Sequence, residues 1–191
     1  GGADNNPSNP NSTRTGFYLM KLMNPNVNWW STAVNSYHPW NVFRYAEILL
    51  NYAEAMNEAY GADSDPKGYG MTARQAVKLI RDRVATLQNA DFSISAPAGN
   101  KEAFRRDVQN ERRIELAFEE HRYWDLRRWK LAETILNQPV HGLQIIKNAD
   151  GSYTYSKYVA ENRVFTEKMY YYPFPNTELK RNPALVQNKG W

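Results

Sequence analysis

Apolar residues recur every three to four positions along the chain, which is the spacing of one face of an α-helix. The first such stretch, 43–60, predicts a helix whose core stripe consists of Tyr45, Leu49, Tyr52, Met56 and Tyr60. Gly61 follows and predicts its end. A second helix begins at Thr72, with Gln75 as the matching half of a capping box, and is expected to bury Ala76, Ile80, Val84 and Leu87. The short loop between them predicts an antiparallel helical hairpin.

A third helical pattern runs from about 101 to 136 and carries charges on its apolar side. A helix of this length is long for a globular domain, so we expect a break within it. Between 108 and 129, one side of the helix collects the apolar side chains Ile114, Phe118, Leu126 and Trp129. The same side carries four charges, Glu111, Glu115, Arg122 and Asp125. If this side is buried, its charges must pair with each other or with a neighbouring helix.

Charged residues along the first helix can supply those partners, because Arg44, Glu47 and Glu54 lie beside its apolar stripe. The charges alternate in sign and share faces with core aromatics, which favours a salt-bridge network that holds the helices in register. We therefore predict a structural ion network of Arg44, Glu47, Glu54, Glu111, Arg112, Glu115, Arg122 and Asp125. The alternative is an acid and base pair for glycoside hydrolysis, which requires two carboxylates facing each other across an open cleft.

The pattern changes after Pro139, where alternating β-favouring residues flank an Asp-Gly turn at Asp150 and predict a β-hairpin. Residues 163–175 suggest a short strand or extended segment. At the other end, residues 1–16 are rich in Asn, Pro, Gly and Ser and indicate a linker or long loop, which leaves 17–191 as the folded domain. The predicted fold is mainly α: helical hairpins of tetratricopeptide-like form, long loops and a small β-hairpin near the C-terminus.

Composition excludes several classes of function. The chain has 191 residues and no cysteine, which rules out disulfides and thiol chemistry. Its net charge of +4 comes from interleaved acids and bases, a pattern that does not indicate nucleic-acid binding. No Gly-rich phosphate loop is present, and we predict no cofactor. We also predict no metal site, because the histidines are scattered and the one loop resembling an EF-hand places Lys67 and Arg74 at ligand positions.

Aromatic residues are abundant, with six Trp and thirteen Tyr, and several fall in the irregular stretch 24–42. Sugar rings stack on the faces of exposed Trp and Tyr side chains, and loops are where such surfaces usually lie. Trp29, Trp30 and Tyr37 are therefore candidate ligand-binding residues. The alternative is that the aromatics of this loop pack over the helical hairpin, and both interpretations stay open here.

Several segments resemble the C-terminal part of SusD/RagB-family proteins. In chain order they are FRYAEILLNYAEAMNEAYG, AVKLIRDRV, NERRIELAFEEHRYWDLRRW, YYPFP and NPALVQNKGW. The resemblance covers roughly 15–191, and its most specific parts are the RRIELAFE and RYWDLRRW block and the ending from Gln187 to Trp191. One position departs from the family pattern, which usually has Gly where Glu120 stands, so it is open whether the helix is continuous there.

The resemblance implies a non-catalytic protein that binds oligosaccharides, or sometimes peptides, at the bacterial cell surface. It implies delivery of these nutrients to a SusC-like TonB-dependent transporter. Such proteins are outer-membrane lipoproteins, and the lipid anchor would lie in a missing N-terminal region. A different class of function is a tetratricopeptide-like module that binds other proteins and no small ligand. The enzyme hypothesis is the weakest, because the acids of this chain lie among arginines.

Overall fold

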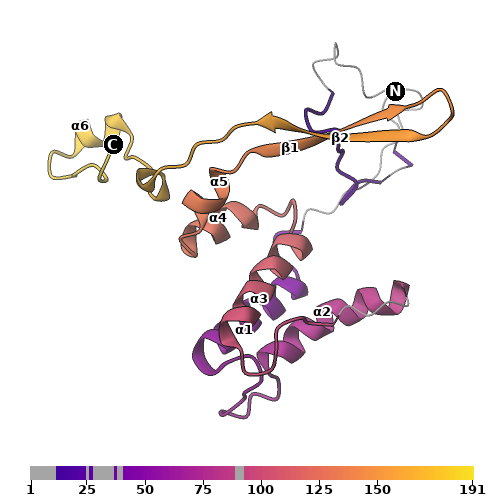
Figure 1. Cartoon of the computed structure of the whole chain (residues 1–191). Helices are drawn as coiled ribbons and strands as arrows, with labels where there is room; N and C mark the ends of the chain where they lie inside the picture. Colours follow the sequence, from indigo (N-terminus) through magenta and orange to yellow (C-terminus); the bar gives the residue numbers. More distant parts are fainter. Residues whose placement is uncertain (1–11, 25, 28–36, 38–40, 89–92) are drawn as a thin grey trace. The chain divides into compact units, whose positions relative to one another are not determined.

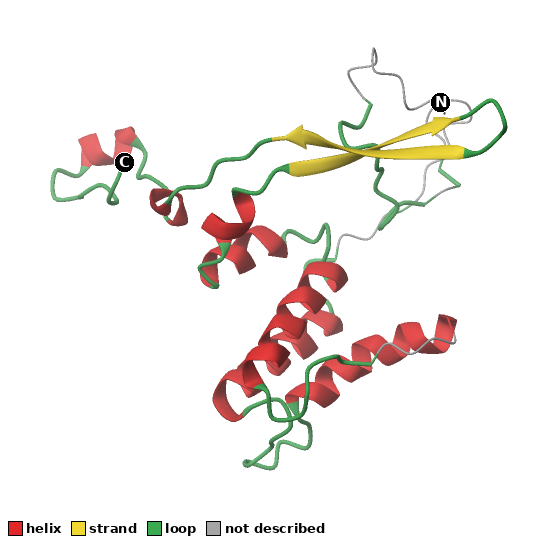
Figure 2. Ribbon diagram, viewed as in Figure 1, coloured by secondary structure: helices red, strands yellow, loops and turns green. Residues whose placement is uncertain are grey.

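The computed structural model describes residues 12–24, 26–27, 37, 41–88 and 93–191 (Figure 1). The chain divides into two compact units. We call Asn26–Arg122 the helical unit, and Gly1–Pro25 with Tyr123–Trp191 the C-terminal unit. The predicted fold class is confirmed: the described residues are mainly helical, with one antiparallel pair of strands toward the C-terminus (Figure 2).

The helical unit consists of α1 (Tyr45–Tyr60), α2 (Ala73–Gln88) and α3 (Lys101–Glu115), and α1 packs against both of the others. Both ends of the predicted hairpin connection are confirmed. Gly61 ends α1 with a φ of +88°, and its N–H donates to the carbonyl of Asn57 at 3.0 Å. Before α2, the N–H of Thr72 donates to Gln75 Oε1 at 2.7 Å, and the N–H of Gln75 donates to Thr72 Oγ1 at 3.2 Å.

The core of the helical unit is built around small residues, which let the helices approach closely. Its buried apolar side chains are Ala46, Leu49, Leu50, Ala53 and Met56 from α1, Ala73, Ala76, Val77 and Ile80 from α2, and Phe104 and Val108 from α3. The predicted stripe on α1 was wrong at its two ends, since Tyr45 is 68% exposed and Tyr60 is 37% exposed. Ala46 and Ala53 belong to the buried face of α1, so this face is rotated from the predicted stripe and the two tyrosines point outward.

The long third helix breaks at residues 116–120, between α3 and α4 (His121–Arg128). Phe118 and Glu120 both have left-handed backbone there, with φ values of +62° and +66°. The expected break is therefore confirmed, and Glu120 does not keep the helix continuous. The turn also changes the helical phase. The single side that was predicted for 108–129 does not form, because Ile114 and Phe118 are exposed while Leu126 is buried.

The C-terminal unit has its own small core of Leu126, Ala132 and Phe165. It contains α5 (Ala132–Leu136), the strands β1 (Val140–Lys147) and β2 (Tyr153–Glu161), the 3-10 helix η1 (Glu167–Tyr170) and α6 (Asn176–Arg181). The predicted hairpin is confirmed, with β1 and β2 antiparallel and Lys147 opposite Tyr153. The segment 163–175, predicted to be extended, is interrupted by η1.

The start of the chain contacts this hairpin within the C-terminal unit. The N–H of Leu143 on β1 donates to the carbonyl of Thr15 at 2.8 Å, and the Tyr158 hydroxyl on β2 donates to the carbonyl of Arg14 at 2.6 Å. Residues 12–16, part of the predicted linker, therefore lie along the strands. Residues 1–11 lie outside the described part of the chain.

Candidate ligand-binding site

The aromatic loop predicted to bind ligand falls largely outside the described residues. Trp29 and Trp30 are not described, whereas Tyr37 is described and fully exposed. An exposed ring is available for contact with a ligand, but a single tyrosine does not define a binding surface. The assignment of these three residues therefore stays a prediction.

Arg44 connects the start of α1 with the end of α3 in the predicted ion network. Its Nη1 lies 2.6 Å from Glu115 Oε1, and its Nε lies 2.7 Å from Glu119 Oε2. Glu115 also accepts from Arg83 of α2 at 3.0 Å, so one carboxylate is shared by two arginines from different segments. The hydrogen bonds that Arg44 donates to Glu119 raise the pKa of Arg44 above its ordinary value, and Glu115 raises it further. The sequence did not single out Glu119, because its position depends on the turn that follows α3.

The other predicted network residues mostly have partners outside the predicted set. Three contacts join them to neighbours in the helical unit: Glu111 with Arg81 at 2.8 Å, Arg112 with Asn51 at 2.6 Å and Glu47 with His121 at 3.6 Å. Glu54 and Arg122 are half-buried in the same unit. Asp125 is buried in the C-terminal unit, where it pairs with Arg128 at 2.9 Å. The carboxylates of Glu111 and Glu115 are thus engaged by arginines, as in a structural network.

An exposed aromatic surface gathers around the buried guanidinium of Arg127 in the C-terminal unit. The Arg127 carbon Cζ lies 5.1 Å from the ring centre of Tyr123, 5.3 Å from that of Trp124 and 4.6 Å from that of Tyr172. Arg127 also donates to the Tyr123 hydroxyl at 2.7 Å and to the carbonyl of Tyr170. Trp124 and Tyr172 are each more than half exposed. We call Tyr123, Trp124 and Tyr172 the aromatic platform.

Hydrogen bonds fix the orientation of the platform. The hydrogen bond with Tyr172 lowers the pKa of the Tyr123 hydroxyl, and the bond from Arg127 lowers it further. The same contact with Tyr123 raises the pKa of Tyr172. Tyr123 and Tyr172 also meet Trp124 edge to face, with ring centres 5.5 and 6.1 Å from the indole. Rings held in this way lose little freedom when a ligand stacks on them, which favours binding.

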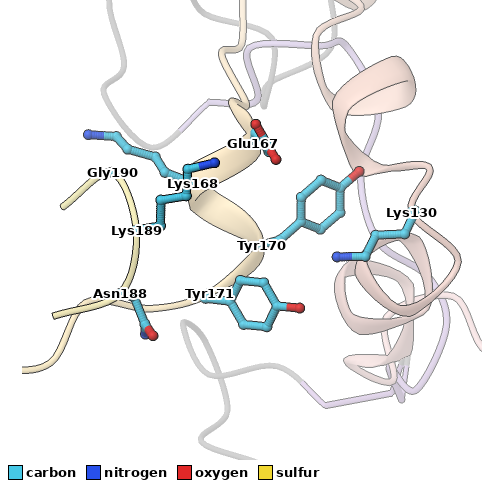
Figure 3. Close-up of a pocket in the computed structure, with 8 residues that line it drawn as sticks. All are labelled: Lys130, Glu167, Lys168, Tyr170, Tyr171, Asn188, Lys189 and Gly190. Carbon is cyan, nitrogen blue, oxygen red and sulfur yellow. The ribbon is translucent and has the colours of Figure 1, made fainter. Parts of the chain in front are cut away.

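A pocket of about 370 Å³ lies in the same unit, between the turn after α4, η1 and the end of the chain (Figure 3). We call it the lysine pocket. Its lining residues are Lys130, Glu167, Lys168, Tyr170, Tyr171, Asn188, Lys189 and Gly190. The Lys130 ammonium lies 4.2 Å from the ring centre of Tyr170 and 5.0 Å from that of Tyr171. The Lys168 ammonium lies 4.3 Å from the Trp191 ring centre.

The chain ending at Trp191 builds one wall of the lysine pocket by holding the backbone of the segment after η1. Gln187 both donates to and accepts from the backbone of Phe174, at 3.0 and 2.8 Å. Asn188 donates to the carbonyl of Tyr172 at 2.6 Å. The Trp191 indole donates to the carbonyls of Lys168 and Tyr171, each at 3.0 Å. The side chains of the ending thus hold the backbone of this segment in place, which gives their specific sequence a structural role.

The opposite wall depends on an unusual backbone position at Lys130. The N–H of Leu131 donates to the carbonyl of Leu126 at 2.9 Å, and the N–H of Lys130 donates to that of Arg127 at 3.1 Å. This is the Schellman ending of a helix, in which the left-handed residue is usually Gly. Here Lys130 takes that position with a φ of +57°. Lys130 therefore combines a strained backbone with a side chain that lines the pocket.

Comparison with known proteins identifies the family. The sequence model described as the SusD family matches residues 1–191. The chain belongs to the SusD family. It is similar to SusD-like protein P2 of Formosa agariphila, with 30% identity over 145 residues, which are 76% of this chain and 24% of that protein. SusD family members are in general cell-surface lipoproteins of the outer membrane and non-catalytic, nutrient-binding partners of TonB-dependent transporters.

Two solved structures extend this comparison to the fold. A SusD-like protein from Bacteroides fragilis has a TM-score of 0.79 and 29% identity, over 97% of this chain and 33% of that one. A protein named BT4246 has a TM-score of 0.60 and 26% identity, over 84% of this chain and 26% of that one. The chain therefore spans between 24% and 33% of the length of these relatives.

Two further findings on the described residues complete the description of this SusD-family chain. Within the described ranges no group of three or more potential metal-ligating side chains comes together. None of the helices in the same ranges has the length and apolar character that a membrane crossing requires. The sequence resemblance singled out the RYWDLRRW block and the ending at 187–191. It could not show that Lys130 and the ending line one pocket, because they lie about 60 positions apart in the chain.

Proposed function

We propose that this protein is a non-catalytic receptor for oligosaccharide, or peptide, nutrients at the bacterial cell surface. It passes its ligand to a SusC-like TonB-dependent transporter and is held at the outer membrane by a lipid anchor outside the chain described here. The observation that carries the proposal is the match of the SusD family over residues 1–191. Residues 17–191 form the C-terminal domain of that receptor, and residues 1–16 lead into it.

The aromatic platform supports the binding role. Trp124 and Tyr172 present exposed ring faces, and the buried guanidinium of Arg127 holds them in place. Aromatic faces of this kind take up the apolar C–H faces of sugar rings. Trp29, Trp30 and Tyr37 remain the second candidate surface, on the strength of their place in a polar loop. The arginine-paired carboxylates of the helical unit support a structural role for the acids.

The test is calorimetric titration of the full-length protein with a panel of neutral tetrasaccharides and short peptides. We expect micromolar to millimolar binding of one ligand class with no release of new reducing ends. Trp124→Ala should weaken binding by about tenfold if stacking contributes about 1–1.5 kcal/mol, and Trp124→Phe should retain most of it. The same measurement on Trp29→Ala with Trp30→Ala tests the loop. Absence of binding by any member of the panel, together with capture of a partner protein, would favour the interaction-module alternative.

A further inference from the structure

We propose that the lysine pocket binds the anionic group of an acidic saccharide, either the carboxylate of a uronic acid or a sulfate ester. The inference rests on the proposed binding of saccharides and adds a site and a charge to it. Three lysines line the pocket from three different segments, the turn after α4, η1 and the end of the chain. Only one carboxylate, that of Glu167, lines it with them.

The lysine charges of this pocket are not neutralised within the described part of the chain. No carboxylate there forms an ion pair with Lys130, Lys168 or Lys189. Lys130 and Lys168 instead lie over aromatic rings. A ring face attracts an ammonium group through its quadrupole but leaves the full positive charge available to an anion. Lys130 and Lys168 both line the cavity, and each ammonium group is held against a ring before any ligand arrives.

The other lining groups favour a sugar over a simple anion. Tyr171 is 62% exposed and lies beside the cavity, where its ring can contact the C–H groups of a pyranose. Glu167 would repel a free anion but accepts hydrogen bonds from sugar hydroxyls. A cavity of about 370 Å³ lies within the range of small-molecule sites. Charge, ring and acceptor together match a hydroxyl-rich ligand with one anionic substituent.

The backbone at Lys130 supports the same inference. This residue occupies the left-handed position of a Schellman ending, where glycine is free of the steric strain that any side chain suffers. A lysine at this position destabilises the helix end relative to glycine while placing an ammonium group over the rings of Tyr170 and Tyr171. Strained backbone clusters at functional sites, so the position of Lys130 supports a role for its side chain.

This position provides a variant that separates binding from folding. Lys130→Gly removes the ammonium group and relieves the backbone. We therefore expect a melting temperature equal to or above that of the parent protein, together with weaker binding of acidic saccharides. Lys130→Ala with Lys168→Ala removes both fixed charges and should weaken that binding by about tenfold, at about 0.7 kcal/mol per partly exposed ion pair. Lys180→Ala on α6 is the matched control, because it removes a lysine outside the pocket and should change nothing.

The experiment is calorimetry on the full-length protein with tetragalacturonate, a sulfated galactose tetrasaccharide, neutral maltotetraose and sodium sulfate. Binding of either acidic tetrasaccharide should weaken as salt rises from about 0.05 to 0.5 M, because the ions screen the lysines. The first two ligands separate a carboxylate from a sulfate source. Sodium sulfate bound as tightly as the sulfated sugar would overturn the saccharide inference in favour of an inorganic anion.

The outcomes distinguish this inference from the proposed function. Binding of maltotetraose without either acidic tetrasaccharide would overturn the inference and leave the proposed function standing. Acidic saccharides bound equally well by the parent and by the double lysine variant would also overturn it, since their site would lie elsewhere. Failure of every oligosaccharide and peptide to bind would overturn both.

Discussion

At the scale of single residues, two of the side chains with left-handed backbone, a conformation that glycine adopts more easily, allow a direct comparison. One is Lys130 in the lysine pocket, and the other is Glu120, with a φ of +66° in the turn between α3 and α4. Glu120 is exposed, and its side chain forms no hydrogen bond or ion pair within the described residues. Lys130 is thus a strained residue with a candidate role, whereas Glu120 is a strained residue without one.

We expect Glu120→Gly to stabilise the protein. Left-handed backbone costs a non-glycine residue about 1–2 kcal/mol, and glycine relieves this cost. The greater freedom of glycine in the unfolded chain opposes the gain by about 0.5–1 kcal/mol. The net gain should be about 0.5–1 kcal/mol in the free energy of unfolding, measured by urea titration. Glu133→Gly, in the first turn of α5, is the control and should instead destabilise by about 1 kcal/mol, because glycine is a poor helix former. A loss of stability in Glu120→Gly would contradict the strain argument.

Asp63 gives the stability a pH dependence. Its carboxylate pairs with Arg74 at 2.5 Å, and this hydrogen bond lowers the pKa of Asp63, with a further contribution from the N–H of Gly99. A pKa that is lower in the folded state contributes stability above the unfolded value of about 4, and the contribution is lost as pH falls. The free energy of unfolding should therefore decline below about pH 5, and less steeply in Asp63→Asn. Lys67→Gln changes a charge in the same loop and should keep the parent slope. Equal slopes in the parent and Asp63→Asn would refute this assignment.

At the scale of elements, Arg44 joins the start of α1 to Glu115 at the end of α3 and to Glu119 in the turn that follows, and Glu115 also pairs with Arg83 of α2. The Arg44 partners Glu115 and Glu119 have side chains only 11% exposed, so removal of Arg44 takes a guanidinium partner from two nearly buried carboxylates. We expect Arg44→Ala to lower the free energy of unfolding by about 2–3 kcal/mol, close to the lower limit for a buried pair that loses one partner. Arg44→Lys keeps the charge but loses the contact of two nitrogens with Glu119. Its free energy of unfolding should therefore lie between those of Arg44→Ala and the parent protein. Chemical denaturation measures both, and a variant as stable as the parent would show that the network does not hold the helices together.

The elements also show which features local sequence can predict. The capping box at Thr72, the stop at Gly61 and the Asp-Gly hairpin depend on residues within a few positions of each other, and all three formed as predicted. The side of α1 that is buried depends instead on which neighbour it meets. Tyr45 and Tyr60 were therefore wrongly assigned to the core, because periodicity alone does not show whether a ring is buried or lies beside the buried face.

The candidate site was less predictable than the fold for a related reason. The aromatic platform and the lysine pocket combine residues of the 121–130 region with residues of 167–172 and 188–191. Nothing local in those segments indicates that they meet. Motif resemblance indicated that these segments matter to the family, whereas the ring and ammonium positions come only from the fold. The predicted stacking residues Trp29 and Trp30 lie outside the described part of the chain, so that surface remains open to test.

At the scale of the whole molecule, the division into two units, each with its own buried core, has a testable consequence. Trp191 donates two hydrogen bonds to the backbone of the C-terminal unit, to Lys168 and Tyr171, so Trp191→Ala should release the segment after η1. Measured by hydrogen exchange and mass spectrometry, amides of 167–174 should exchange about tenfold faster, equivalent to about 1.4 kcal/mol of lost local stability.

Amides in α1, within the helical unit, should keep their protection in Trp191→Ala, because they belong to a separate core. Arg44→Ala serves as the reciprocal variant and should speed exchange in α1 while leaving 167–174 protected. This pair of variants tests whether local opening follows the two cores. Faster exchange across both units in either variant would mean that they open as one cooperative block, and damage to the helical scaffold would then also disturb the lysine pocket.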